Sequence, residues 1–455
     1  MDVLDLTRLQ FAVVTIYHYF FVPLSISLAA AAAGLQIAWL RTKRAEYLHL
    51  TKFVGKILIV TFAVGVVTGL VQEFQFGLGW SAFAKFYGDV FGPTLAIEGM
   101  LAFFLEATFL ALWYFGWDRL PRLVHTATIV IVAIGTVLSA FIILAANSFM
   151  QHPVAYELDP VTQRARLTSF TELLLNKVNL AAFPHTLAGA IMVGGALLLA
   201  LGVWRLRADG TFRIMARLGA WMTLAGGALT ALTGDHLGKV MTEVQPMKMA
   251  AAEALYETTK GAPFSIFTIG SPFPDFSLDI PWLLSILAKG NPTATVQGIN
   301  DLQAQYAAQY GPGSYVPMIP VAFWSFRVMI GAGMLAAAVA AYYLWRTRKH
   351  REAPRWLTRW LPLIPILPAV ANTFGWIFTE TARQPWIAFG ISKVADGISP
   401  GLTSSEVIAS LAGFTVIYGI LAVVWFRLIR HLARQPLAPP AGAEAEAAAE
   451  PAPVY

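Results

Sequence analysis

Seven ionisable side chains and one methionine interrupt the long apolar stretches of this 455-residue chain. They are His18, Glu73, Glu98, Glu106, His185, Arg327, Met329 and Glu380. A titratable group inside an apolar span is costly, and by default it marks a functional interior. The chain contains no cysteine. A metal bound here would therefore be held by histidine, methionine or carboxylate.

Several kinds of chemistry suit this set of residues. Haem iron takes a histidine axial ligand, and a His/Met pair is typical of a low-spin electron-transfer haem. Carboxylates alone could instead form the proton relay of an ion-coupled transporter. Structural roles are also open: Met329 could fill a gap in a core. Glu98 and Glu106, about 80° apart on a helix of ~3.6 residues per turn, could form a satisfied polar stripe.

The composition indicates a membrane protein. Hydrophobic residues make up 57% of the chain and charged residues 13%, whereas soluble domains carry about 25% charged residues. The net charge of +6 does not indicate nucleic-acid binding, because the basic residues form short clusters between apolar runs. The acidic start, Asp2 and Asp5, is unlike a cleavable signal peptide. We therefore expect the first span to be retained.

Nine stretches are long enough to cross a hydrocarbon core of roughly 30 Å as helices, which predicts an all-α polytopic protein. They cover residues 10–40, 53–76, 92–117, 124–147, 180–204, 217–234, 320–345, 357–379 and 405–428. Basic clusters such as 41–44 and 346–359 fall on one side, so the positive-inside rule places the N-terminus outside and the C-terminus in the cytoplasm. The ionisable residues then share the outer half of the membrane, and His125 is expected to be solvated in a cytoplasmic connection.

The spans divide the chain into four parts. Residues 1–234 hold the first six transmembrane helices and most candidate site residues, and 320–435 hold the last three. Between them, 235–319 form a long outer loop, and loops of that length are usually functional or disordered. The Ala/Glu/Pro-rich segment 436–455 is predicted to be a disordered cytoplasmic tail.

Several blocks of sequence along the chain form a recognisable series: Thr7–Phe11 with Tyr17-His18, Thr68–Gly77, Ala96–Glu106, Phe115–Arg119, Phe183–Thr186, Lys248–Glu253, Phe326–Met329 and Gly375–Trp386. Together these blocks resemble subunit I of the cytochrome bd-type quinol oxidases. They occur in the order of the family, and only the tail is left uncovered. The Glu-Phe-Gln-Phe-Gly block at 73–77 and the Arg-Gln-Pro-Trp block at 383–386 are the most specific.

The resemblance implies ligands for three haems. His185 and Met329 match the axial ligands of the low-spin haem b558. His18 and Glu380 match axial ligands of the two active-site haems, b595 and d, and which haem belongs to which ligand stays open. The other matched positions are Glu98 and Glu106 for proton delivery, Arg327, Trp376 and Arg383 around the haems, Lys248 and Glu253 for quinol, and Lys56, Asp118, Ser139 and Asn147 for an inward-facing proton route.

The function implied by the resemblance is that of a catalytic subunit in the bacterial cytoplasmic membrane. It would oxidise quinol near the outer face and reduce O₂ to water with protons from the cytoplasm. Its partners would be a second large membrane subunit (subunit II), with or without small single-span subunits. The short outer loop resembles a class that includes cyanide-insensitive oxidases, in which haem b can replace haem d.

Three rival interpretations stay open from the residues alone. An ion-coupled transporter leaves the pair of His185 and Met329 unexplained, and a cytochrome that only passes electrons on leaves His18 and Glu380 without a role. A structural scaffold does not explain so many charges in apolar spans. For Lys248, a solvated loop lysine is as consistent with the sequence as a quinol ligand.

Overall fold

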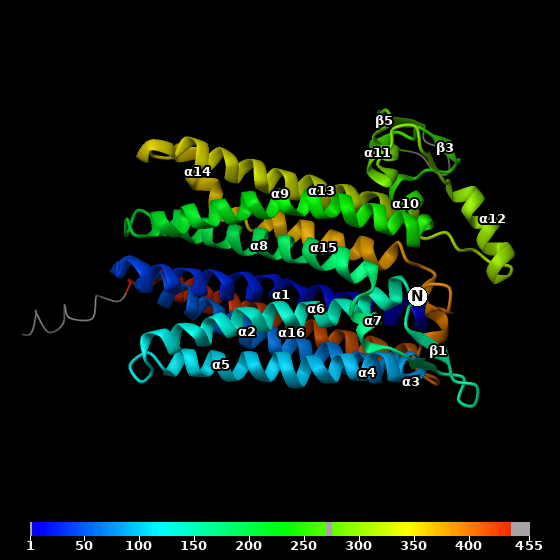
Figure 1. Ribbon diagram of the computed structural model, residues 1–455, viewed down its shortest axis with the longest axis horizontal. Coiled ribbons are helices and arrows are strands. Elements are labelled where there is room, and N and C mark those ends of the chain that lie inside the picture. Colours follow the sequence, from blue (N-terminus) through cyan, green and yellow to red (C-terminus); the bar gives the residue numbers. More distant parts are fainter. Residues whose placement is uncertain (1, 270–274, 438–455) are drawn as a thin grey trace, which may run out of the picture.

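Long helices running side by side build most of the molecule (Figure 1). The computed structural model describes residues 2–269 and 275–437. The α-helices are α1 (Val3–Thr42), α2 (Ala45–Leu78), α3 (Ser81–Phe86), α4 (Gly88–Ile97), α5 (Phe104–Phe115), α6 (Arg122–Gln151), α7 (Phe170–Leu174), α8 (Lys177–Arg205), α9 (Phe212–Val244), α10 (Pro246–Glu253), α11 (Leu283–Lys289), α12 (Ile299–Tyr310), α13 (Ile319–Arg346), α14 (Arg355–Trp360), α15 (Ile366–Thr381) and α16 (Ser404–Arg434).

Short elements complete the fold. A π-helix, η1 (Glu98–Phe103), joins α4 to α5, and the 3₁₀ segments are η2 (Arg348–His350), η3 (Leu361–Leu363) and η4 (Val394–Gly397). Four two-stranded antiparallel sheets pair β1 (Tyr156–Leu158) with β2 (Ala165–Leu167), β3 (Thr259–Lys260) with β6 (Thr295–Val296), β4 (Phe264–Ile269) with β5 (Phe276–Ile280), and β7 (Trp386–Ala388) with β8 (Ser392–Lys393).

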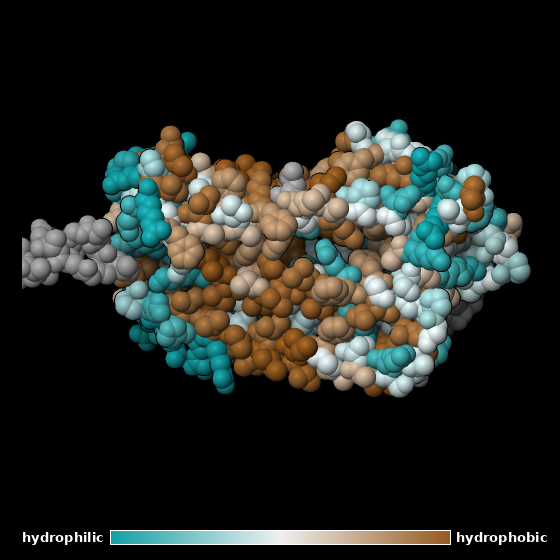
Figure 2. All heavy atoms as spheres, turned by 90° about the horizontal axis from the view of Figure 1, so that it is seen from below, coloured by the Kyte–Doolittle hydropathy of each residue, from teal (hydrophilic) through white to brown (hydrophobic). Residues whose placement is uncertain are grey.

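The distribution of apolar residues is that of a multi-pass membrane protein. Within the described residues, eight helices are long and apolar enough to cross a membrane. The third is the continuous run α4–η1–α5, and the seventh is the run from α14 to α15. Figure 2 shows, on the face in view, a broad apolar band across the middle of the molecule and polar residues at both ends.

The predicted ninth span corresponds to α9. This helix has 33 residues and packs along α8, but it is not among the eight. The count of nine and the orientation of the termini therefore stay predictions. In Figure 1 the N-terminus lies at the end of the bundle that carries α10, α11 and α12, which we call the loop end.

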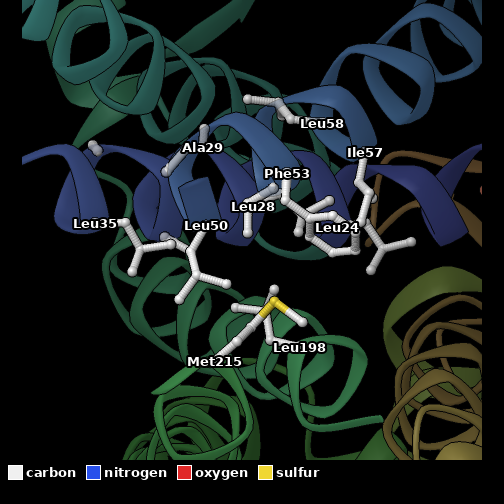
Figure 3. Packing of buried hydrophobic residues seen from close by; sticks show 14 of the residues in the cluster. Leu24, Leu28, Ala29, Leu35, Leu50, Phe53, Ile57, Leu58, Leu198 and Met215 are labelled. Carbon is white, nitrogen blue, oxygen red and sulfur yellow. The ribbon is translucent and has the colours of Figure 1, made fainter. Parts of the chain in front are cut away.

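Two groups of helices meet at α1 and α8. In one group α8, α9, α13 and α15 pack on one another, and in the other α1 packs on α2, α6 and α16. Small residues permit close contact between helices in membranes: a Cβ added at Gly194 of α8 would lie 1.8 Å from Oγ of Ser27 on α1. Leu24, Leu28, Phe53 and Leu198 pack beside this crossing (Figure 3).

One expectation from the sequence is wrong: His125 is not solvated. It is 2% exposed on α6, where its Nδ1 lies 2.8 Å from the side-chain nitrogen of Gln36 and its Nε2 lies 2.7 Å from the carbonyl oxygen of Trp113. Trp113 in turn donates its indole N–H to Gln36 Oε1 over 2.6 Å. The basic cluster at Arg122 begins the helix, and His125 is one turn further in, facing α5 and α1.

The predicted outer loop is partly helical. Helix α9 continues ten residues past position 234 to Val244, and α10 follows directly. The remainder, up to Ile319, consists of short elements that lie at the loop end (Figure 1). The predicted disordered tail lies outside the described residues, apart from positions 436 and 437.

Candidate functional site

His185 lies on α8 and is turned toward α9. Its Nδ1 is 3.1 Å from the backbone carbonyl oxygen of Thr230, which can only accept a hydrogen bond. The Nδ1 atom therefore carries the proton, and Nε2 keeps its lone pair. A neutral imidazole fixed in this tautomer by a carbonyl is the usual form of a histidine that ligates a metal.

Glycines on neighbouring helices lie against both members of the predicted His/Met pair. A Cβ at Gly234 of α9 would lie 3.1 Å from Cε1 of His185, and a Cβ at Gly375 of α15 would lie 2.9 Å from Sδ of Met329. The helices that carry these four residues are the group α8, α9, α13 and α15. The two candidate ligands thus occupy one helix group, each beside a position without a side chain.

His18 on α1 has a similar environment in the other group. Its Nδ1 lies 3.0 Å from Oγ1 of Thr68 on α2, and that hydroxyl already donates its hydrogen to the backbone of α2. The His18 Nδ1 atom is therefore the donor, which again leaves the Nε2 lone pair available. A Cβ at Gly69 would lie 3.1 Å from His18 Cε1.

Glu380 ends α15 within a polar cluster. Its Oε2 pairs with the guanidinium of Arg383, and its Oε1 accepts a hydrogen bond of 2.9 Å from the amide of Asn147 on α6. Near it, the Lys248 ammonium donates to Oε1 of Gln151 over 2.5 Å and to the carbonyl oxygen of Thr379 over 3.0 Å. The cluster therefore joins α6, α10 and α15.

Lys248 is not a solvated loop lysine, because it is only 3% exposed. Burial lowers its pKa to about 7, against the opposing effect of the nearby Glu380 carboxylate. Of its three N–H donors, two have the acceptors just named, and the third has no acceptor among residues 2–269 and 275–437 and can bind a further partner.

Glu253 lies on the same short helix as Lys248 but faces another neighbour. Its Oε2 is 2.6 Å from the Arg327 guanidinium of α13, and both side chains are buried. The same arginine donates to the carbonyl oxygens of Ala252 and Ser265. Burial raises the pKa of Glu253 to about 7, although the positive charge of Arg327 opposes this shift. A carboxyl with such a pKa can accept a proton near neutral pH.

Glu98 begins the π-helix, and Glu106 lies in the first turn of α5 that follows it. Glu98 accepts a hydrogen bond of 2.7 Å from Ser139 of α6, and Glu106 is buried with its Oε1 unpaired among the described residues. A Cβ at Gly135 would lie 2.8 Å from Cγ of Glu106, so α6 approaches it closely. The wider turns of η1 invalidate the angle of about 80° from a uniform ~3.6-residue period. Single π turns are frequent at functional sites.

The residues present fit haem binding. Each candidate histidine has a free Nε2 lone pair and stands beside a glycine. Buried donors also lack acceptors within residues 2–269 and 275–437, among them Nε of Arg383 and Nε1 of Trp376, and haem propionates are acceptors that would suit them. The Trp376 ring stacks on Tyr19, next to His18, with 5.2 Å between centroids. Trp376 and Arg383 thus border the His18 and Glu380 positions.

The residues matched to a proton route are divided. Ser139 donates a hydrogen bond to Glu98, and Asn147 donates one to Glu380. Lys56 and Asp118 are instead exposed, and the Lys56 ammonium lies 3.3 Å from Gln435 Oε1.

The sequence analysis missed Gln151, the partner of Lys248. The only signal for Gln151 was that it is a polar residue at the end of an apolar span. It also missed Thr68 and Thr230, because threonines in helices are common.

Comparisons with known proteins point to one family. The family model for "Cytochrome bd terminal oxidase subunit I" matches residues 6–437. The chain is 39% identical to cytochrome bd ubiquinol oxidase subunit 1 of Bacillus subtilis (strain 168), covering 95% of this chain and 94% of that protein. It is 32% identical to cytochrome bd-II ubiquinol oxidase subunit 1 of Escherichia coli (strain K12), covering 95% and 96%. The fold resembles a chain of the bd oxidase from Geobacillus thermodenitrificans with a TM-score of 0.86, at 29% identity and covering 96% and 99%.

Proposed function

Because the chain belongs to the family of cytochrome bd terminal oxidase subunit I, we propose that it is the catalytic, haem-bearing subunit of a membrane quinol oxidase that releases protons outside and consumes cytoplasmic protons. Quinol is oxidised near the outer face, and O₂ is reduced to water. The enzyme resides in the bacterial cytoplasmic membrane and acts with a subunit II, with or without small single-span subunits.

The proposed haem ligands are four residues on four helices: His18 on α1, His185 on α8, Met329 on α13 and Glu380 on α15. His185 and Met329 would hold the low-spin haem b558, while His18 and Glu380 would hold the two active-site haems. When bound, these haems supply electron transfer and the reduction of O₂. The observation that carries this assignment is the hydrogen bond from His185 Nδ1 to the Thr230 carbonyl, because it leaves Nε2 as the only ring atom free to ligate.

The quinol site is built on α10. Glu253 accepts a proton from the quinol hydroxyl, since its pKa of about 7 suits a base near neutral pH. Arg327 holds this carboxylate in place over 2.6 Å. Lys248 uses its remaining N–H to orient a quinol oxygen from the side of Glu380. The two residues of this short helix contact different neighbours, Lys248 on α6 and α15 and Glu253 on α13.

Proton delivery uses the carboxylates beside α6. Glu106 is the deeper group along the α4–η1–α5 run, and its unpaired Oε1 can receive a proton. Glu98 passes protons on beside Ser139, which donates to it. The third haem is haem d, or haem b as in the short-loop class.

The proposal is tested by His185→Ala in the purified complex, with His236→Ala as control. His236 is an exposed histidine of α9. We expect His185→Ala to lose the low-spin b-type absorption band and quinol-driven O₂ consumption, and the control to keep both. An unchanged low-spin b-type band in His185→Ala would contradict the assignment of His185 as a haem ligand.

A further inference from the structure

An amphipathic hairpin stands at the loop end. Strands β4 and β5 pair antiparallel, with Phe264 opposite Ile280, Phe267 opposite Leu278 and Ile269 opposite Phe276. An irregularity between Ser265 and Phe267 keeps these three pairs on the same face. Cross-strand neighbours share a face of a sheet, so six apolar side chains form one surface, which we call the hairpin face.

The other side of the hairpin is polar. Ser265 pairs with Asp279 and Thr268 with Ser277, and Ser277 donates to the Asp279 carboxylate over 2.8 Å. Five side chains of the hairpin face, in contrast, are exposed: Phe267 is 37% exposed, Ile269 54%, Phe276 58%, Leu278 53% and Ile280 41%. The sixth, Phe264, is partly buried and packs against the cluster around Leu284. An isolated two-stranded hairpin is marginally stable in water. A dense apolar face on such a hairpin therefore needs a cover.

The hairpin face continues into the surface of a membrane-spanning helix. The Phe267 ring contacts Trp324 of α13 with 5.2 Å between centroids, and Trp324 is itself 40% exposed near the start of that span. Tryptophans at span ends typically lie at the membrane interface. The hairpin is also held to α13, because the Arg327 side chain donates to the carbonyl oxygen of Ser265 over 3.0 Å. The hairpin face is thereby fixed at the depth of the first turns of α13.

We propose that the hairpin face rests on the lipid bilayer, contacting the acyl chains of the leaflet that α13 enters at the loop end. The hairpin lies along the boundary between headgroups and acyl chains, because open strand edges do not occur within the hydrocarbon core. The exposed Asp279 on its polar side then faces water, while Ser265 is buried. Arg327 donates to the carbonyl oxygen of Ser265 and forms an ion pair with Glu253. The lipid contact therefore lies next to the proposed quinol site.

Site-directed spin labelling tests the contact. The chain has no cysteine, so Leu278→Cys gives it a single labelling site, and Ser277→Cys is the matched control on the polar side. A nitroxide is attached to each in the full complex, reconstituted in phospholipid vesicles without quinol. Collision rates with O₂, which concentrates in acyl chains, and with a water-soluble nickel chelate are measured by EPR.

We expect the ratio of O₂ to nickel collisions to be several-fold higher at position 278 than at 277. Equal nickel access at both positions would overturn the proposal in favour of a hairpin in water. An immobilised label at 278 that neither reagent reaches would overturn it in favour of a protein partner. Ile269→Cys and Thr268→Cys provide a second pair if the first variant does not assemble. The measurement needs no turnover, so it is independent of the proposed function.

Discussion

Replacing Gly375 by alanine should displace the proposed methionine ligand. The new Cβ would lie 2.9 Å from Sδ of Met329, whereas ordinary contacts are about 3.5–4.0 Å. The sulfur must therefore move by about 0.6–1.1 Å, which exceeds the ~0.5 Å within which a ligand group has to be held. Alanine is favoured over glycine in helices by about 1 kcal/mol, so the helix itself is not weakened.

The assay is a redox titration of the low-spin haem band in the purified complex. A methionine ligand raises the potential of a haem, so Gly375→Ala should lower the midpoint potential and weaken the band. Gly331→Ala is the control, because it lies on the helix of Met329 and its Cβ would meet nothing within 4 Å. A wild-type potential and spectrum in Gly375→Ala would refute the placement of Met329 as a ligand.

Three further predictions concern proton transfer and stability. Glu106→Gln should slow quinol-driven O₂ consumption, and proton uptake by the enzyme in vesicles, by about 10²-fold. This is the lower end of the rate loss expected when an acid–base group is removed. The rate of quinol oxidation should fall as the pH drops through about 7, because protonated Glu253 cannot accept a proton; Glu253→Gln should abolish this limb of the pH profile. Gln36→Leu should shorten the thermal half-life of the complex, because Trp113 Nε1 and His125 lose partners at about 1–3 kcal/mol each.

The Glu253 and Gln36 predictions each have a control within the chain. Glu257→Gln changes a carboxylate outside the site, and its pH profile should match the wild type. Gln305→Leu removes an exposed glutamine of α12 and should leave the half-life unchanged. Undiminished charge movement in Glu106→Gln would contradict the proposed proton route, and an unshifted profile in Glu253→Gln would contradict the role of Glu253 as base.

The sequence predicted a mostly helical, polytopic membrane protein, and it drew attention to most candidate site residues because burial in lipid makes ionisable residues rare. A residue such as His185 stands out when its neighbours are all apolar. The direction in which Lys248 and Glu253 point was not predictable. Both lie on an eight-residue helix, and only the packing of α10 against α6, α13 and α15 decides their partners.

Local deviations from regular structure were also not predictable from the sequence. The π-helix at Glu98 changes which face Glu106 occupies, and no periodicity argument anticipates an inserted wide turn. His125 was misjudged because charges of Arg122 suggested a solvated segment, whereas its contacts come from α1 and α5, far away in the sequence. Tertiary contacts decide such cases.

The most direct test of the whole account is a reduced-minus-oxidised visible spectrum of the purified complex, recorded with and without CO. We expect b-type bands together with a CO-reactive haem, seen either as a far-red band for haem d or as a b-type component. A complex with full subunit content and no haem absorption would contradict the ligand assignments of His18, His185, Met329 and Glu380.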